Sequence, residues 1–178
     1  MHPHQRQLIL LILLGGPLVL ASYVEGIFRH PDTAPLLWGA IPEAVIPYYT
    51  ANMFVAATGF FLFTYHLLWQ VEPSGIDIAG RFDFRFFSLC YGLIFLGSMT
   101  WMPLSLYAVE HQAAHLESAI DGVLWMTALA SVGILIGLIA IRPSWPSRSW
   151  RLAVLGSLMF LGQTLILDAL VWPSFFSL

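Results

Sequence analysis

Five long runs of apolar residues alternate with short segments that concentrate the charged residues and prolines. An α-helix needs about 20 predominantly apolar residues to cross the hydrocarbon layer of a bilayer. The runs that meet this length are Leu8–Phe28, Ile46–Gln70, Phe84–Tyr107, Ser118–Ile141 and Trp150–Trp172. The pattern therefore predicts an all-α polytopic membrane protein, in which a single domain over residues 1–178 forms an antiparallel bundle of five transmembrane helices.

The first run also has features of a secretory signal peptide. Arg6 precedes the apolar stretch, and the tripeptide that ends at Ala21 loosely matches a small-residue cleavage site. However, the run stays apolar as far as Phe28, which is longer than the hydrophobic core of a typical signal peptide. We therefore expect the first run to be a membrane span.

The segment between the first two runs, residues 29–45, is rich in proline and contains its own apolar piece, Leu36–Ile41. Its prolines are Pro31, Pro35 and Pro42, and Pro47 follows just beyond it. Proline lacks a backbone donor and interrupts helices, while an apolar piece of this kind is unfavourable in water. We predict that this loop folds back along the membrane interface, where it either shields helix ends or caps a site.

The other connections are short, so consecutive helices are expected to run antiparallel and to contact one another. Gly133 and Gly137 form a small-xxx-small pair in the fourth run. Because glycine has no side chain, this pair permits the close approach of a neighbouring helix.

The composition supports lipid as the main solvent of the chain. Apolar residues make up 58% and charged residues only 10%, whereas soluble domains have roughly 25% charged residues. The chain has no lysine and no clustered basic face, which argues against nucleic-acid binding. Its one cysteine, Cys90, lies in an apolar run and leaves neither a disulfide framework nor a thiolate metal cluster.

Arginine positions predict the orientation in the membrane. With five spans, one side carries Arg6, Arg81, Arg85, Arg142, Arg148 and Arg151, whereas the other side has only Arg29. Arginine and lysine are enriched on the cytoplasmic side of membrane proteins. We predict a cytoplasmic N-terminus and a C-terminus on the outer side.

Polar residues within the predicted spans gather in the outer half, when depth is counted inward from each boundary. They are Glu25, Asn52, Thr100, Asp121, Gln163 and Asp168, and Trp101 and Trp125 lie in the same layer. Aromatic walls with a few convergent polar groups are typical of a small-molecule pocket. We predict that these eight residues line a ligand pocket. Alternatively, the amides bond between helices and the carboxylates reach the lipid headgroups.

The segment from Glu110 to Glu117 has the densest group of metal-binding side chains. In a helix, His111 and His115 share one face and could bind zinc, iron or copper. Glu110, Glu117 or an acid from another span could supply a third ligand. The alternative is a solvated loop. Within a span, His66 is expected to ligate a cofactor axially or, more commonly for such residues, to hydrogen-bond a neighbouring helix.

Chain length, five spans, seven tryptophans and a proline-rich first loop resemble the translocator, or tryptophan-rich sensory protein, family in outline. The proline- and tryptophan-rich signature of that family at the start of the second helix is not reproduced by residues 39–49. No family residue is therefore carried over to this chain.

Three functions follow from these observations. The first is binding or translocation of an apolar or amphipathic small molecule, because few charges lie within the spans for a strongly charged solute. The second is a structural or accessory subunit, whose partners are other membrane proteins or further copies of the chain. The third is a metal-dependent membrane enzyme that uses the region of His111 and His115.

Overall fold

The computed structural model describes residues 1–78, 80–141 and 147–177, and 81% of the chain is helical. The long helices are α1 (Pro3–Arg29), α2 (Ile46–Trp69), α3 (Arg85–Glu110) and α4 (Glu117–Ala140). The fifth rod consists of α5 (Arg148–Leu161), the π-helix η4 (Gly162–Val171) and the 3-10 turn η5 (Trp172–Ser174). Further 3-10 turns are η1 (Ala34–Trp38), η2 (Pro73–Gly75) and η3 (Ala114–Leu116). The described residues contain no strand, and the all-α prediction is confirmed.

Five helical rods are long and apolar enough to cross a membrane, as the hydrophobic pattern predicts. They contain 24 to 27 residues each, which at 1.5 Å per residue is about 36 to 40 Å, somewhat more than the hydrocarbon thickness of about 30 Å. The first helix begins earlier than predicted, at Pro3, because His2 and Gln5 form a capping box there. The Gln5 amide also donates to the Leu68 and Val71 carbonyls at the end of α2.

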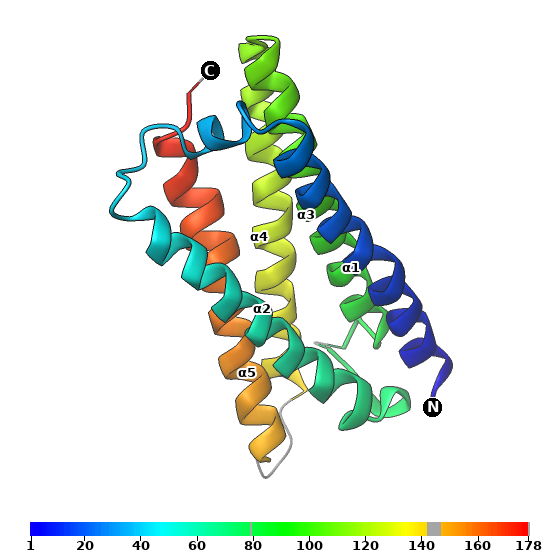
Figure 1. Cartoon of the computed structure of the whole chain (residues 1–178). Helices are drawn as coiled ribbons and strands as arrows, with labels where there is room; N and C mark the ends of the chain where they lie inside the picture. Colours follow the sequence, from blue (N-terminus) through cyan, green and yellow to red (C-terminus); the bar gives the residue numbers. More distant parts are fainter. Residues whose placement is uncertain (79, 142–146, 178) are drawn as a thin grey trace.

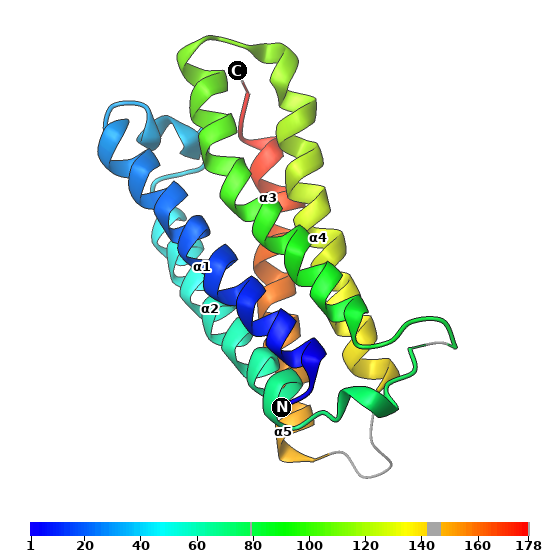
Figure 2. The same ribbon diagram turned by 90° about the vertical axis from the view of Figure 1, so that its right-hand side faces the viewer.

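The helices gather in two groups that meet along the bundle axis (Figure 1). Helix α3 packs between α1 and α4, whereas α2 packs chiefly on α5 and contacts α1 only at a few points. Thus α3 and α4 meet as the short connection predicts, but α2 takes its main partner from the far end of the chain. In the view of Figure 2, α1 and α2 lie along one edge of the bundle and α3 lies beside α4.

The two ends of the bundle carry different connections (Figures 1 and 2). The N-terminus, the α2–α3 connection and the start of α5 lie at one end, called here the N-terminal end. The loop after α1, the α3–α4 connection and the C-terminus lie at the other, called the C-terminal end.

Aromatic rings fill the space between α2, α3 and α5. The Phe60 ring lies 5.4 Å from those of Phe63 and Tyr91, 5.9 Å from that of Phe95 and 6.0 Å from that of Phe160. Tilted and edge-on ring pairs at such distances stabilise a core beyond their buried area. The middle of the bundle is consequently a packed aromatic layer.

Glycines allow close contact between α3 and α4. A side chain at Gly137 would meet the Phe87 ring, and one at Gly133 would meet the Cys90 thiol. The predicted small-xxx-small pair therefore lies at a helix contact, and it packs onto side chains of α3 within this chain.

The contact between α2 and α5 is a seam with a regular repeat. It pairs Asn52 with Gln163, Gly59 with Gly156 and His66 with Ser149. Each step is seven residues along both helices and runs in opposite directions, which is the spacing of an apposed helix pair with coiled-coil-like packing. At the centre, a Cβ on Gly59 would meet the Gly156 carbonyl oxygen, and a Cβ on Gly156 would meet that of Gly59.

Replacing Gly59 by alanine is expected to destabilise the protein by about 1–3 kcal/mol, because the new methyl group collides with backbone that cannot rotate away. The free energy of unfolding in mixed micelles measures the effect. Gly92→Ala is the matched control, since nothing lies within 4 Å of a Cβ at that helical position, and it should be neutral or slightly stabilising. Equal effects of the two substitutions would contradict a backbone contact at the seam.

Candidate functional site

Three of the predicted pocket residues join in one hydrogen-bonded network near the C-terminal end. The Asn52 amide donates to Gln163 Oε1 at 2.9 Å, and Gln163 Nε2 donates to Asp168 Oδ1 at 2.6 Å. The same carboxylate oxygen accepts a bond from the Tyr49 hydroxyl at 3.2 Å. Sequence reasoning missed Tyr49, although it lies one turn before Asn52 on the same face of α2.

The π-helix η4 makes the contact between Gln163 and Asp168 possible. In an α-helix, two residues five positions apart point about 140° away from each other. The wider turn of a π-helix bonds residue i to residue i+5 and brings such a pair onto one face, a distortion frequent at functional sites. This local change of winding is what lets Gln163 reach the carboxylate of its own helix.

The first loop covers the network from the C-terminal end of the bundle. The Trp38 ring packs edge-on against Tyr49 with 5.6 Å between centroids, and Ile41 is buried beside Tyr49 and Trp172. The Trp172 indole donates to the Leu37 carbonyl at 2.8 Å. This proline-rich first loop therefore packs over the polar network.

Two further contacts hold this loop in place. The Ala40 amide donates to the Phe175 carbonyl at 2.8 Å, next to Gly39, whose φ of 53° favours glycine. At the other edge, Glu110 Oε1 lies 2.5 Å from His30 Nδ1 and accepts a bond from the Thr33 hydroxyl at 3.2 Å. The loop is therefore fastened to both the C-terminal segment and the end of α3.

Polar groups in this region have unused bonding capacity among the described residues, and the buried Ser105 hydroxyl, one turn after Trp101 on α3, is one of them. Both hydrogen bonds to the half-buried Asp168 fall on Oδ1, so that Oδ2 accepts none from the residues that the structure describes. The indole Nε1 of Trp101 is buried without a partner in the same set of residues. The Trp101 ring lies 5.5 Å from that of Trp172 and 6.2 Å from that of Tyr23.

The other predicted pocket residues do not join the network. Glu25 faces Arg29 at 3.8 Å near the surface, and the Thr100 hydroxyl donates to the Leu96 carbonyl of its own helix. Asp121 takes no part in the network, and Trp125 is 39% exposed on the outside of α4. Depth in a span does not determine which way a side chain faces, because each residue turns the helix by about 100°.

The predicted metal site is not assembled in the described part of the chain. Helix α3 ends at Glu110, and the chain turns through Gln112, at φ 49°, before η3 begins at Ala114. His111 and His115 thus lie on an exposed connection and not on one helix face, while Glu110 bonds to His30. The described residues hold no cluster of three histidine, cysteine or acidic side chains that could bind a metal ion.

The remaining histidine within a span, His66, makes a contact between helices. It is buried, and its Nδ1 lies 2.9 Å from the Ser149 hydroxyl on α5. This is the hydrogen-bonding alternative that the sequence offered for His66, and it forms the third rung of the α2–α5 seam.

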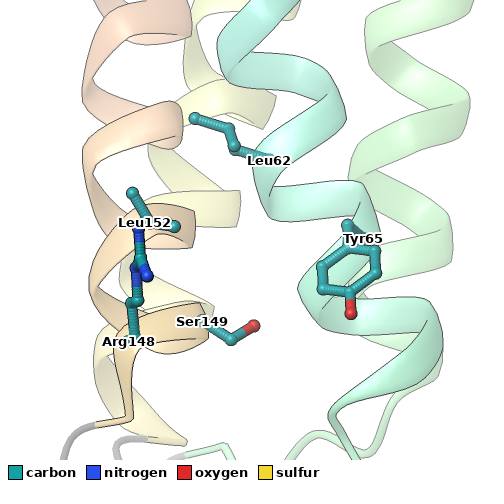
Figure 3. Close-up of a pocket in the computed structure, with 5 residues that line it drawn as sticks. All are labelled: Leu62, Tyr65, Arg148, Ser149 and Leu152. Atoms are coloured by element: carbon teal, nitrogen blue, oxygen red, sulfur yellow. The ribbon is translucent and has the colours of Figure 1, made fainter.

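Two clefts open at the N-terminal end, far from the polar network. One of about 210 Å³ lies between α2 and α5 (Figure 3). The other, of about 400 Å³, lies beside Gln5 and the residues that follow α2. Neither is lined by a residue of the predicted pocket.

No family model, curated protein or solved structure matches the chain.

Asn52→Leu and Gln163→Leu are each expected to lower the free energy of unfolding, and their effects should be coupled. Hydrogen bonds between membrane helices contribute about 0.6 kcal/mol on average and up to about 1.7 kcal/mol, which sets the expected coupling. A double-mutant cycle of unfolding in mixed micelles measures it. Thr58→Val serves as the control, because the Thr58 hydroxyl bonds only to its own helix; additive effects of Asn52 and Gln163 would contradict a direct bond.

Proposed function

We propose that the chain is an integral membrane protein with a cytoplasmic N-terminal end and an outer C-terminal end. Five apolar rods of spanning length support insertion. Described arginines at the N-terminal end are Arg6, Arg81, Arg85, Arg148 and Arg151, whereas Arg29 lies at the opposite end, and Arg142 lies outside the described residues. This distribution supports the orientation through the positive-inside rule.

Cysteine labelling tests this orientation in sealed cells. Ala114 and Ser74 are exposed and lie on connections at opposite ends of the bundle. In a Cys90→Ala background, an impermeant maleimide should label Ala114→Cys directly and Ser74→Cys only after permeabilisation. The reverse pattern, or equal labelling of both, would overturn the proposal.

We propose that the protein binds an apolar or amphipathic small molecule at the Asp168 network, under the first loop. The observation that carries this proposal is the pair of unused groups, the Asp168 Oδ2 acceptor and the Trp101 Nε1 donor. Unsatisfied polar groups are costly in an apolar environment, and intramembrane carboxylates commonly mark functional sites. A molecule with a donor, an acceptor and an apolar body would satisfy both groups.

Binding is favoured over translocation along the bundle axis. The aromatic layer around Phe60 lies between the network and the N-terminal end, and its rings are in mutual contact. Opening a path through it would separate several packed rings, whereas access from the C-terminal end requires only displacement of the loop held at Leu37 and Ala40.

Three probes with one apolar body test the binding function: 1-naphthylmethylamine, 1-naphthylmethanol and 1-naphthoate. Equilibrium dialysis against protein in phosphatidylcholine nanodiscs measures their dissociation constants. The amine should bind most tightly, because its ammonium group pairs with the Asp168 carboxylate. Asp168→Asn should weaken amine binding by about tenfold or more, since a hydrogen bond to a charged group contributes about 1.5–3 kcal/mol.

Asp121→Asn is the matched control for this experiment. It removes the same charge from a helix that contributes no residue to the network, so amine binding should stay unchanged. Equal binding of the three probes, or equal loss in both variants, would contradict recognition by Asp168.

The second candidate function is that of an accessory subunit in a larger membrane assembly. Helix α1 favours it, because α1 packs mainly on α3 and exposes a broad apolar face that includes Leu13, Leu14 and Leu20. If the folded protein binds none of the three probes, ligand binding at Asp168 is contradicted and the accessory-subunit function is the one that stands.

A further inference from the structure

The cleft between α2 and α5 lies at the N-terminal end of the seam, beside its third rung (Figure 3). Leu62 and Tyr65 line it from α2, and Arg148, Ser149 and Leu152 line it from α5. It is separate from the Asp168 network, which lies two seven-residue steps further along both helices.

The cleft is lined mostly by apolar atoms. Leu62 lies nearest the middle of the bundle, and the Arg148 side chain extends from the start of α5 toward Leu152 (Figure 3). The Ser149 hydroxyl is held by His66 at 2.9 Å, which keeps this wall in place. Tyr65 stacks on Trp69 with 5.5 Å between ring centroids, the kind of aromatic pair found at a membrane–water interface.

Arg148 supplies a positive charge that the described acids leave unneutralised. Arg29 and Arg85 lie 3.8 and 4.0 Å from a carboxylate. In the described ranges Arg148 forms no ion pair with an acid, and neither do Arg6, Arg81 and Arg151, but Arg148 is the one among these that lines the cleft. Arg148 is also the first residue of α5, where the helix dipole adds partial positive charge. An anionic group is the complement of this end of the cleft.

The size of the cleft limits what it can hold. Its volume of about 210 Å³ is below the range of about 300–1,000 Å³ that is usual for pockets enclosing a small molecule. Tyr65 and Leu152 are 52% and 38% exposed, so its side is open between the helices. A molecule seated here must leave most of its surface outside the protein, as a lipid does when its chains remain in the bilayer.

We propose that this cleft binds an anionic phospholipid of the cytoplasmic leaflet. The phosphate group pairs with Arg148, and one acyl chain enters between Leu62 and Leu152. Basic sites between helices on the cytoplasmic side are known to hold anionic lipid headgroups. The inference depends on the proposed membrane insertion, but it is independent of ligand binding at Asp168.

Native mass spectrometry of the full-length protein tests the proposal by comparing dioleoylphosphatidylglycerol with dioleoylphosphatidylcholine. The wild type should retain the anionic lipid preferentially. Arg148→Ala should weaken that retention about fivefold, the factor expected for one arginine at a charged membrane surface. Arg151→Ala is the matched control, because Arg151 is an exposed arginine on the same helix that does not line the cleft.

Three more measurements decide the nature of the ligand. Leu152→Trp, which fills the apolar end, should also reduce retention, whereas unchanged retention would overturn entry of an acyl chain. Inorganic phosphate should not compete at millimolar concentration, and effective competition would show that the site binds a free anion and not a lipid.

Equal losses in Arg148→Ala and Arg151→Ala, or equal retention of both lipids, would overturn a specific site. Asp168→Asn should leave lipid retention intact, which separates this test from that of the small-molecule site.

Discussion

The seam between α2 and α5 is the interaction on which both proposed sites depend. A polar pair at each end and a glycine pair at the centre hold the two helices in one register. In an apolar environment, a polar side chain without a partner is costly, so a slip along the seam would separate both polar pairs at once. The glycine pair then determines how closely the backbones approach.

The Asp168 network grows from one end of this seam. Gln163 bonds across the seam to Asn52 and, through the π-helical turn, also reaches the carboxylate five residues later. Tyr49 completes the arrangement from the opposite helix and lies under Trp38 of the first loop. The Asp168 carboxylate therefore connects the register of the α2–α5 seam, the π-helical winding of η4 and, through Tyr49, the packing of the first loop.

The two ends of the bundle present different chemistry. At the N-terminal end, Arg148 and Tyr65 line an open-sided cleft together with leucines, and this is the cleft proposed to hold an anionic lipid. At the C-terminal end, the apolar loop is fastened by hydrogen bonds and closes over a polar interior. The aromatic layer around Phe60 lies between the two proposed sites.

The sequence by itself determined the elements of this protein, because helix length and apolar composition are local properties. The five rods, the proline-rich loop and the glycine pair at Gly133 and Gly137 follow from such local patterns. Only the tertiary structure decided which polar residues meet, because helix rotation and the choice of α5 as the partner of α2 depend on contacts between distant segments. The π-helical turn at Asp168 could likewise not be predicted from the spacing of apolar residues, because hydrogen bonds across the seam stabilise its winding.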